Sequence, residues 1–332
     1  MKKVGLVFLF IVVAFVNAIG CLNDFVLKDG TIITNDGSYS LESGNPNAIP
    51  TGHKFIGALL PSALKRLDSL WKVTNDIDYF SDYALVLILQ GKYEDGKNSY
   101  LEIEKIKPGR YATASNLGTV YELLGDDKNA LKWIKKAIKI NPGSHHDSEW
   151  LHVKILEAKI KGETFVTSDF LLNTNFGNAT IPTSNLSKDE LWNLKITLVY
   201  QLNERMTFIK PENKIMAQLL FDLGNVFLLE ENKENALTVY KMAKEYGYSN
   251  SLLSIRMNYL KQKLATNAMP SDPTGGLDEP AVQTIDGNTT YQTPPASDAD
   301  YTLFYILGLC TSILSISIFF FFKRNKEKST ID

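Results

Sequence analysis

A short polar stretch in the middle of the chain carries three of its four histidines. His145, His146 and His152 occur within eight residues, and Asp147 lies among them. Imidazole and carboxylate groups are ligands of transition metals, and histidines six or seven residues apart can share a helix face. The stretch therefore supports a metal-binding hypothesis. Asp147 or Ser148 also suits the N-cap of a helix, and the sequence leaves both interpretations open.

A second stretch has part of the spacing of a phosphate-binding loop. Residues 91–98 read GKYEDGKN, but Asn98 stands where a magnesium-binding hydroxyl would be needed. Glu94 and Asp95 would also repel a phosphate. The sequence contains no His-Glu-x-x-His, Gly-x-Ser-x-Gly or Cys-x-x-Cys motif. We therefore expect no catalytic residues and no cofactor.

Landmark residues around these glycines recur with a fixed period. Gly91 and Gly125 are 34 residues apart, and so are Pro108 and Pro142. Each glycine marks a turn between two helices, and each proline ends a second helix because it cannot continue one. Two landmarks in the same register indicate a repeated helical hairpin.

The residues between the landmarks have the sizes that packed helices need. Gly118 is followed three residues later by Tyr121, and Ala130, Ile134 and Ala137 then lie on one face of a second helix. Crossing helices need small residues at close contacts and bulky residues where they interlock. This pattern resembles the tetratricopeptide repeat (TPR), a helix–turn–helix unit of about 34 residues.

The resemblance covers a little over half of the chain and implies an all-α fold, a TPR-like solenoid of helical hairpins. A weaker copy lies at residues 220–248, where Glu231 and Tyr248 replace the glycine and the proline. We predict the helical domain over residues 61–264, with a helix starting at Pro61 that covers its first end.

Two stretches do not follow the repeat. Residues 22–60 are rich in Gly, Asn and Ser, and we expect them to be irregular apart from a short hairpin. Residues 164–186 are rich in Asn, Thr and Ser and have no helical period, so they are predicted to be an inserted loop. Helices resume at Ser187, which forms a capping-box signature with Glu190.

The resemblance also implies a binding surface. Proteins of this family bind peptides or partner proteins in a concave groove lined by the first helices of the hairpins. Transferred position by position, that groove would be lined here by Ser81, Ser115, Thr119, Glu122, Glu149, Phe221 and Asn225. These positions lack the Lys and Asn clamp with which some relatives bind a C-terminal carboxylate, so that ligand is not implied.

The N-terminus has the layout of a secretory signal peptide. Two lysines precede an apolar run, and small residues ending at Ala18 provide a cleavage site. We predict a signal peptide over residues 1–18, with an uncleaved N-terminal anchor as the alternative. Residues 18–21, AIGC, also resemble a bacterial lipobox, which makes Cys21 a lipidation candidate.

A second apolar segment lies near the C-terminus. Residues 302–322 carry no charge, and a helix of this length, about 31 Å, matches the hydrocarbon core of a bilayer. The sequence KRNKEK follows, and positive residues stay cytoplasmic. We predict a single transmembrane helix at residues 302–322 and a cytoplasmic tail at residues 323–332. The bulk of the chain would then be extracytoplasmic, in a periplasmic location.

Composition completes the sequence-based hypothesis. Residues 265–300 contain no Lys or Arg and are predicted to be a disordered linker. The formal net charge of the chain is −2, which gives no indication of a nucleic-acid partner. We expect a membrane-tethered scaffold, not an enzyme, that binds a protein or peptide in its groove. The alternative is a metal-dependent enzyme or metal-binding protein that uses His145, His146 and His152.

Overall fold

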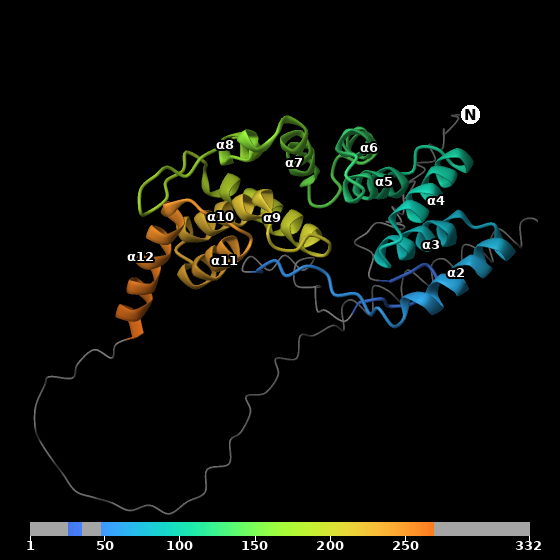
Figure 1. Cartoon of the computed structure of the whole chain (residues 1–332), viewed down its shortest axis with the longest axis horizontal. Coiled ribbons are helices and arrows are strands. Elements are labelled where there is room, and N and C mark those ends of the chain that lie inside the picture. Colours follow the sequence, from blue (N-terminus) through green and yellow to red (C-terminus); the bar gives the residue numbers. More distant parts are fainter. Residues whose placement is uncertain (1–25, 35–47, 269–332) are drawn as a thin grey trace, which may run out of the picture. The chain divides into compact units, whose positions relative to one another are not determined.

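The computed structural model describes residues 26–34 and 48–268 (Figure 1). In these ranges every regular element is a helix, and two isolated antiparallel bridges join Val26 to Ile32 and Thr34 to Phe55. The predicted helical-repeat fold is confirmed for this part of the chain. Within it, none of the helices combines the length and the apolar composition that crossing a membrane requires.

Several predicted segments lie outside the described residues. These are the signal peptide at residues 1–18, Cys21, the transmembrane helix at residues 302–322 and the tail at residues 323–332. The predicted linker also lies outside them from residue 269 onward. All of these assignments stay predictions from the sequence.

Three helical hairpins form the repeating part of the fold (Figure 1). They are α3 with α4 (Ile77–Leu89, Tyr93–Ile106), α5 with α6 (Tyr111–Leu123, Asp127–Ile140), and α10 with α11 (Lys214–Leu229, Lys233–Glu245). The first hairpin is preceded by α2 (Leu60–Thr74), and the third is followed by α12 (Ser251–Ala268). Between the second and third hairpins lie α7 (Glu149–Lys161), the short helices η1 and α8, and α9 (Lys188–Met206).

Each hairpin turns through the same backbone geometry. The φ angle is 77° at Gly91, 80° at Gly125 and 61° at Glu231. The next amide then donates to the carbonyl five residues earlier, as between Asn232 and Phe227 at 2.9 Å, which is a Schellman turn. Glu231 therefore takes a conformation that favours glycine, at a cost of roughly 1–2 kcal/mol.

Other glycines let the two helices of a hairpin approach closely. A Cβ atom on Gly118 would lie 2.3 Å from Cδ1 of Ile134, and one on Gly224 would lie 2.4 Å from the ring of Tyr240. Both partner side chains are fully buried. The prediction that small residues mark the helix contacts is confirmed at these positions.

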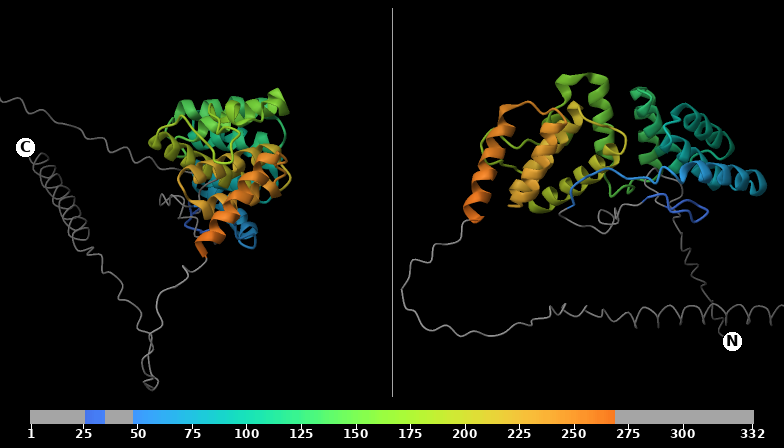
Figure 2. Two further views of the ribbon diagram at one scale, coloured as in Figure 1. Left: turned by 90° about the vertical axis from the view of Figure 1, so that its left-hand side faces the viewer. Right: turned by 60° about the horizontal axis from the view of Figure 1, so that its bottom comes forward.

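The apolar core consists of two large clusters and a small one. One large cluster joins α2–α5 to Leu27 and Ile33, and the other joins α7–α12 to Ala48. A small cluster between α6 and α7 contains Ala130, Ile134 and Leu156. The helices of the two large clusters are seen as separate groups in Figure 2.

The inserted segment is more regular than the sequence indicated. We expected residues 164–186 to be a loop, but they contain part of η1 (Glu163–Phe165) and all of α8 (Ser168–Leu172). Thr167 caps α8 by accepting a hydrogen bond from the amide of Phe170 at 3.2 Å. One helical turn is too short to show a helical period, which is why the sequence pattern does not indicate α8.

Two helix boundaries also differ from the prediction. The helix α2 begins at Leu60, and Pro61 lies in its first turn. At the other end, α12 continues to Ala268, so residues 265–268 are helical rather than part of the linker. The capping box at Ser187 is present as predicted, and Glu190 accepts from the Ser187 amide at 2.8 Å.

Candidate functional site

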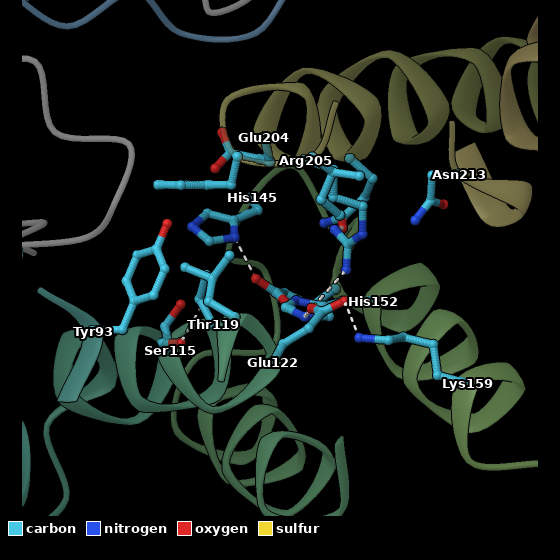
Figure 3. A pocket seen from close by; sticks show the side chains of 15 residues that line it. Tyr93, Ser115, Thr119, Glu122, His145, His152, Lys159, Glu204, Arg205 and Asn213 are labelled. Atoms are coloured by element: carbon cyan, nitrogen blue, oxygen red, sulfur yellow. Dashed lines mark hydrogen bonds and ion pairs between the residues drawn. The ribbon is translucent and has the colours of Figure 1, made fainter. Parts of the chain in front are cut away.

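A cavity of about 400 Å³ lies between α5, α7 and α9 (Figure 3). Figure 3 shows charged side chains from all three helices pointing toward one another. Most of the lining comes from these helices and from the residues that follow α9: Tyr93, Ser115, Thr119, Glu122, Leu123, His145, Glu149, His152, Lys159, Gln201, Glu204, Arg205, Phe208, Ile209 and Asn213.

Glu122 connects the three helices that form the cavity. Its carboxylate lies 2.8 Å from Nε2 of His152, 3.4 Å from Nη2 of Arg205 and 3.4 Å from Nζ of Lys159. Only 9% of the side chain is exposed. Burial alone would raise the pKa of this carboxyl, but Arg205, His152 and Lys159 hold the pKa well below its ordinary value. Glu122 is therefore a buried carboxylate that joins α5 to α7 and α9.

Glu149 is a second buried carboxylate in the cavity wall. Its Oε1 pairs with Nδ1 of His145, and its Oε2 lies 3.3 Å from Nδ1 of His152. Burial would raise the pKa of Glu149, but the two imidazoles lower it well below the ordinary value. The His145 ring also lies 3.2 Å from the Tyr111 hydroxyl and stacks on Tyr200 at 5.3 Å. These contacts fix the imidazole against the carboxylate.

The turn before α7 has an uncommon backbone. His145, His146 and Asp147 have φ angles of 54°, 55° and 58°, in the left-handed region. Each such residue costs roughly 1–2 kcal/mol, so its tertiary contacts must hold the turn in place. Ser148 is the N-cap of α7 but makes no side-chain capping bond. Its hydroxyl instead accepts from Gln201 at 3.0 Å, which attaches α7 to α9.

Arg205 lies in the wall that α9 contributes. Its Nη1 donates to the side-chain oxygen of Gln201 at 2.7 Å, and its Nη2 faces Glu122. The side chain is 6% exposed, and Nε has no hydrogen-bond partner among the described residues. A buried guanidinium with an unused N–H is a donor that an oxygen atom of a ligand could satisfy.

The segment before α2 lies against the end of α9. Oδ1 of Asn203 accepts from the amides of Thr51 at 3.1 Å and Gly52 at 2.9 Å. His53 pairs with Glu204 at 2.8 Å. Gly52 has a φ of 78°, and a Cβ atom there would lie 2.8 Å from the backbone of α9. Because Glu204 lines the cavity, this segment helps to hold one of its walls.

The structure brings together four of the seven residues predicted to line a groove. Those that line the cavity are Ser115, Thr119, Glu122 and Glu149. The other three, Ser81, Phe221 and Asn225, are 0%, 4% and 0% exposed and line no part of it. These three positions therefore contribute nothing to the cavity, and their role in a partner-binding groove stays a prediction.

Phe221 and Asn225 are covered by α12 and by the inserted segment. Nη1 of the buried Arg256 donates to Oδ1 of Asn225, and the guanidinium lies 5.3 Å from the centroid of the Phe221 ring. Nη2 donates to the carbonyl oxygens of Gly177 at 2.8 Å and Ala179 at 3.0 Å. This cover comes from segments outside the hairpin, and the repeat register gives no indication of it.

Ser81 is buried in the first hairpin, at the other end of the array. Leu27 and Ile33 belong to the same core cluster as α3, and the amide of Lys28 donates to the side chain of Asp82. The carbonyl oxygen of Ser81 accepts from the hydroxyl of Tyr100 at 2.9 Å. The hydrogen bond to Ser81 thus comes from the second helix of its own hairpin.

The three clustered histidines do not converge. His145 and His152 each face glutamates, whereas His146 packs on Tyr200 with ring centroids 5.5 Å apart. Within residues 26–34 and 48–268, no group of three or more His, Cys, Asp or Glu side chains is arranged to hold a metal ion. The geometry of this stretch gives no support to the metal-binding hypothesis.

Comparison with known proteins identifies the class of repeat. The tetratricopeptide repeat family matches residues 113–144. A tetratricopeptide repeat protein from Parabacteroides merdae ATCC 43184 is 15% identical, with a TM-score of 0.30, over 61% of this chain and 92% of that one. BtubC (BKLC) from P. vanneervenii is 10% identical, with a TM-score of 0.29, over 70% of this chain and 97% of that one. None of the curated proteins matches the sequence. The chain thus contains a tetratricopeptide repeat within an array of helical hairpins.

Reasoning from the sequence missed the residues that α9 and α12 contribute. Gln201 and Arg205 are four residues apart, beside the face of α9 that carries Leu198 and Leu202. A polar pair at helical spacing next to an apolar stripe indicates that the flank is also buried. Arg256 is the lone charge in SLLSIRMNYL, at residues 251–260, which is a comparable signal.

Proposed function

We propose that this protein is a membrane-tethered, extracytoplasmic scaffold that binds a segment of a partner protein and catalyses no reaction of its own. The tetratricopeptide repeat at residues 113–144 supports a role in protein–protein interaction. The observation that carries the proposal is the cavity at the groove positions of α5. Among residues 26–34 and 48–268, no side chain donates a hydrogen bond to Thr119 as Arg256 does to Asn225.

The lining of the cavity suits a short peptide segment. Ser115 and Thr119 offer hydroxyls, Tyr93 and Phe208 offer aromatic surface, and Arg205 offers a buried N–H donor. A peptide supplies both apolar side chains and backbone carbonyls, so it can use both kinds of surface. The volume of about 400 Å³ fits a few side chains rather than a folded domain.

The membrane tether is supported by the sequence. Residues 302–322 are uncharged and long enough to span a bilayer, and basic residues follow them. The last described helix ends at Ala268. The 33 residues from 269 to 301 could span up to about 110 Å when fully extended. That length would let the helical domain reach partners well away from its anchor.

Substitution of Thr119 tests the proposal. Thr119→Arg places a long charged side chain in the cavity, so crosslinked capture of the partner by the full chain in its membrane should fall by about tenfold or more. Thr238→Arg is the matched control on exposed α11. Both threonine hydroxyls donate to the carbonyl four residues earlier, at 3.3 Å for Thr119 and 2.9 Å for Thr238. Equal capture by the two variants would show that the cavity is not the binding site.

A further inference from the structure

The outer face of α6 carries a row of lysines. Five lysines recur along the helix at helical spacing: Lys128, Lys132, Lys135, Lys136 and Lys139. Only Asp127 in this helix carries the opposite charge. The opposite face, with Ala130, Ile134 and Ala137, is fully buried. The lysines are therefore displayed on one side of a rigid element.

The second helices of the other two hairpins lack such a row. Helix α4 has two lysines and four acidic residues, and α11 has three lysines and two acidic residues. All three helices take the same place in a hairpin, so the fold itself does not require the lysines on α6. The formal net charge of the whole chain is −2. The positive face is thus a local property of this one helix.

Three of the five lysines form no ion pair with any described residue. Lys135 pairs with Glu157 at 3.0 Å, and Lys136 pairs with Glu104. The exposed residues Lys128, Lys132 and Lys139 form no ion pair in the part of the chain that the structure describes. Unpaired ammonium groups close together repel one another, so a bound anion would relieve this repulsion.

An aromatic ring lies among the lysines. Trp133 and four of the lysines surround an open hollow of about 500 Å³. Nζ of Lys136 lies 4.5 Å from the centroid of the Trp133 ring. Indole rings and lysines together are typical of protein surfaces at the level of lipid headgroups, where the ring is partly in an apolar layer and the ammonium groups meet phosphates.

We propose that the outer face of α6 binds the phosphates of an anionic phospholipid surface. The inference rests on the proposed membrane tether, which keeps the domain within reach of a bilayer. Charge complementarity favours this occupant, because each lysine near an anionic membrane strengthens binding by about fivefold. The contact weakens at high salt, since exposed charges are screened. On a bilayer, α6 would contact the lipid surface, and the cavity would be held at a fixed distance from that surface.

The test uses the full chain in lipid discs of two compositions. One set contains phosphatidylcholine alone, and the other contains phosphatidylcholine mixed with phosphatidylglycerol. The rate at which a soluble reagent acylates Lys132 and Lys139 is read by peptide mass spectrometry. We expect the acylation rates of both lysines to be reduced by at least about fivefold in the anionic discs. High salt should restore the rates seen in phosphatidylcholine alone. Lys241 on α11 should react equally in both.

A charge-reversal variant supplies the second arm. The triple variant Lys128→Glu, Lys132→Glu and Lys139→Glu changes only exposed side chains, so it should fold normally. It should abolish the protection of Lys135 and Lys136 in anionic discs. The matched control, with Lys188→Glu, Lys241→Glu and Lys261→Glu, also changes only exposed lysines and should keep that protection.

Equal acylation rates in the two kinds of disc would overturn the proposal, whether the lysines are unprotected in both or protected in both. Either result would show that the contact does not depend on anionic headgroups. Failure of the chain to enter discs at all would refute the membrane tether instead. Protection of Lys132 by added phosphatidylglycerol vesicles would then still decide whether α6 binds the lipid. Loss of partner capture by Thr119→Arg is independent of both results.

Discussion

The second and third hairpins present the same repeat positions in opposite ways. Thr119 and Glu122 of α5 line a cavity, whereas Phe221 and Asn225 of α10 lie beneath Arg256. Both hairpins have the same turn geometry and the same close glycine contact, so the hairpins themselves do not cause the difference. The difference comes from the segments outside the hairpins: α9 leaves a cavity beside α5, whereas α12 and the insertion fill the space beside α10.

The two regions also balance their buried carboxylates differently. Glu122 faces Arg205, and its pKa is held well below the ordinary value. On α10, Asp222 accepts hydrogen bonds from Ser168 at 2.7 Å and Gln218 at 3.1 Å, yet burial raises its pKa to about 7. Folding therefore favours the ionised acid at the cavity and the protonated acid beneath the insertion, and pH acts on the two regions in opposite directions.

The largest effect is expected from removing the cover at the third hairpin. Arg256→Met leaves the carbonyl oxygens of Gly177 and Ala179 without the Arg256 donor, and leaves Asn225 with only the Tyr240 hydroxyl. The free energy of unfolding should fall by about 4–5 kcal/mol, measured by urea denaturation. The control, Lys261→Met on the exposed side of α12, should change it by less than about 0.5 kcal/mol. A small loss in Arg256→Met would show that the insertion is held by other contacts.

The next largest effect is a pH dependence of the free energy of unfolding, which arises from Asp222 in α10. The folded-state pKa of Asp222, about 7, lies above its ordinary value of 3.8. The folded protein therefore keeps a proton that the unfolded chain releases. Stability should fall by about 3–4 kcal/mol as the pH rises from about 4 to about 7, and then level off.

Asp222→Asn isolates this contribution. The variant has no titrating group at this position, so the fall in its free energy of unfolding up to about pH 7 should disappear, leaving only the smaller rise at about pH 4–5 from Glu122 and Glu149. Denaturant titrations of both proteins on either side of pH 7 provide the measurement. An unchanged slope in the variant would assign the pH dependence to another group.

At the cavity, the expected effect is smaller and has the opposite sign with pH. Glu122→Gln removes the charge that faces Arg205 and His152, and should cost about 2–3 kcal/mol near neutral pH. In the unchanged protein this contribution is complete above the ordinary pKa of 4.5 and is lost as the pH falls below it. Ser115→Ala, in the same wall, is the control and should cost less than about 0.5 kcal/mol. Equal losses in both variants would indicate general damage to α5.

The smallest effect on stability is expected at the turns of the second and third hairpins, which have the same backbone geometry. Glu231→Gly removes the cost of a positive φ and should raise the free energy of unfolding by about 1 kcal/mol. The reciprocal change, Gly125→Glu, should lower it by a similar amount. If only one of the two changes has an effect, the turns are not equivalent.

Much of the helical array could be predicted from local chemistry. Gly91 and Gly125 mark turns, and Gly118 and Ala130 mark close helix contacts, because both requirements act within one hairpin of the chain. The boundaries of α8 and α12 were less predictable. A five-residue helix shows no period. The end of α12 at Ala268 lies two residues before Pro270, a stop signal that the predicted end at Leu264 did not use.

The candidate site could be predicted only in part, for a physical reason. Ser115, Thr119 and Glu122 share a helix face, so the repeat register places them together. Arg205 is 83 residues from Glu122, and nothing local to either residue specifies the other. The cover over Asn225 likewise depends on the insertion and on α12, whose docking follows from buried area and hydrogen bonds across the whole domain.

Photo-crosslinking from equivalent repeat positions tests the central comparison most directly. A small diazirine side chain is placed at Thr119 in one protein and at Phe221 in another, and the full chains are irradiated in their membranes. We predict that Thr119 forms adducts with a partner protein, and that Phe221 forms adducts only within its own chain. Partner adducts from Phe221, or their absence from Thr119, would contradict the account of one open and one covered position.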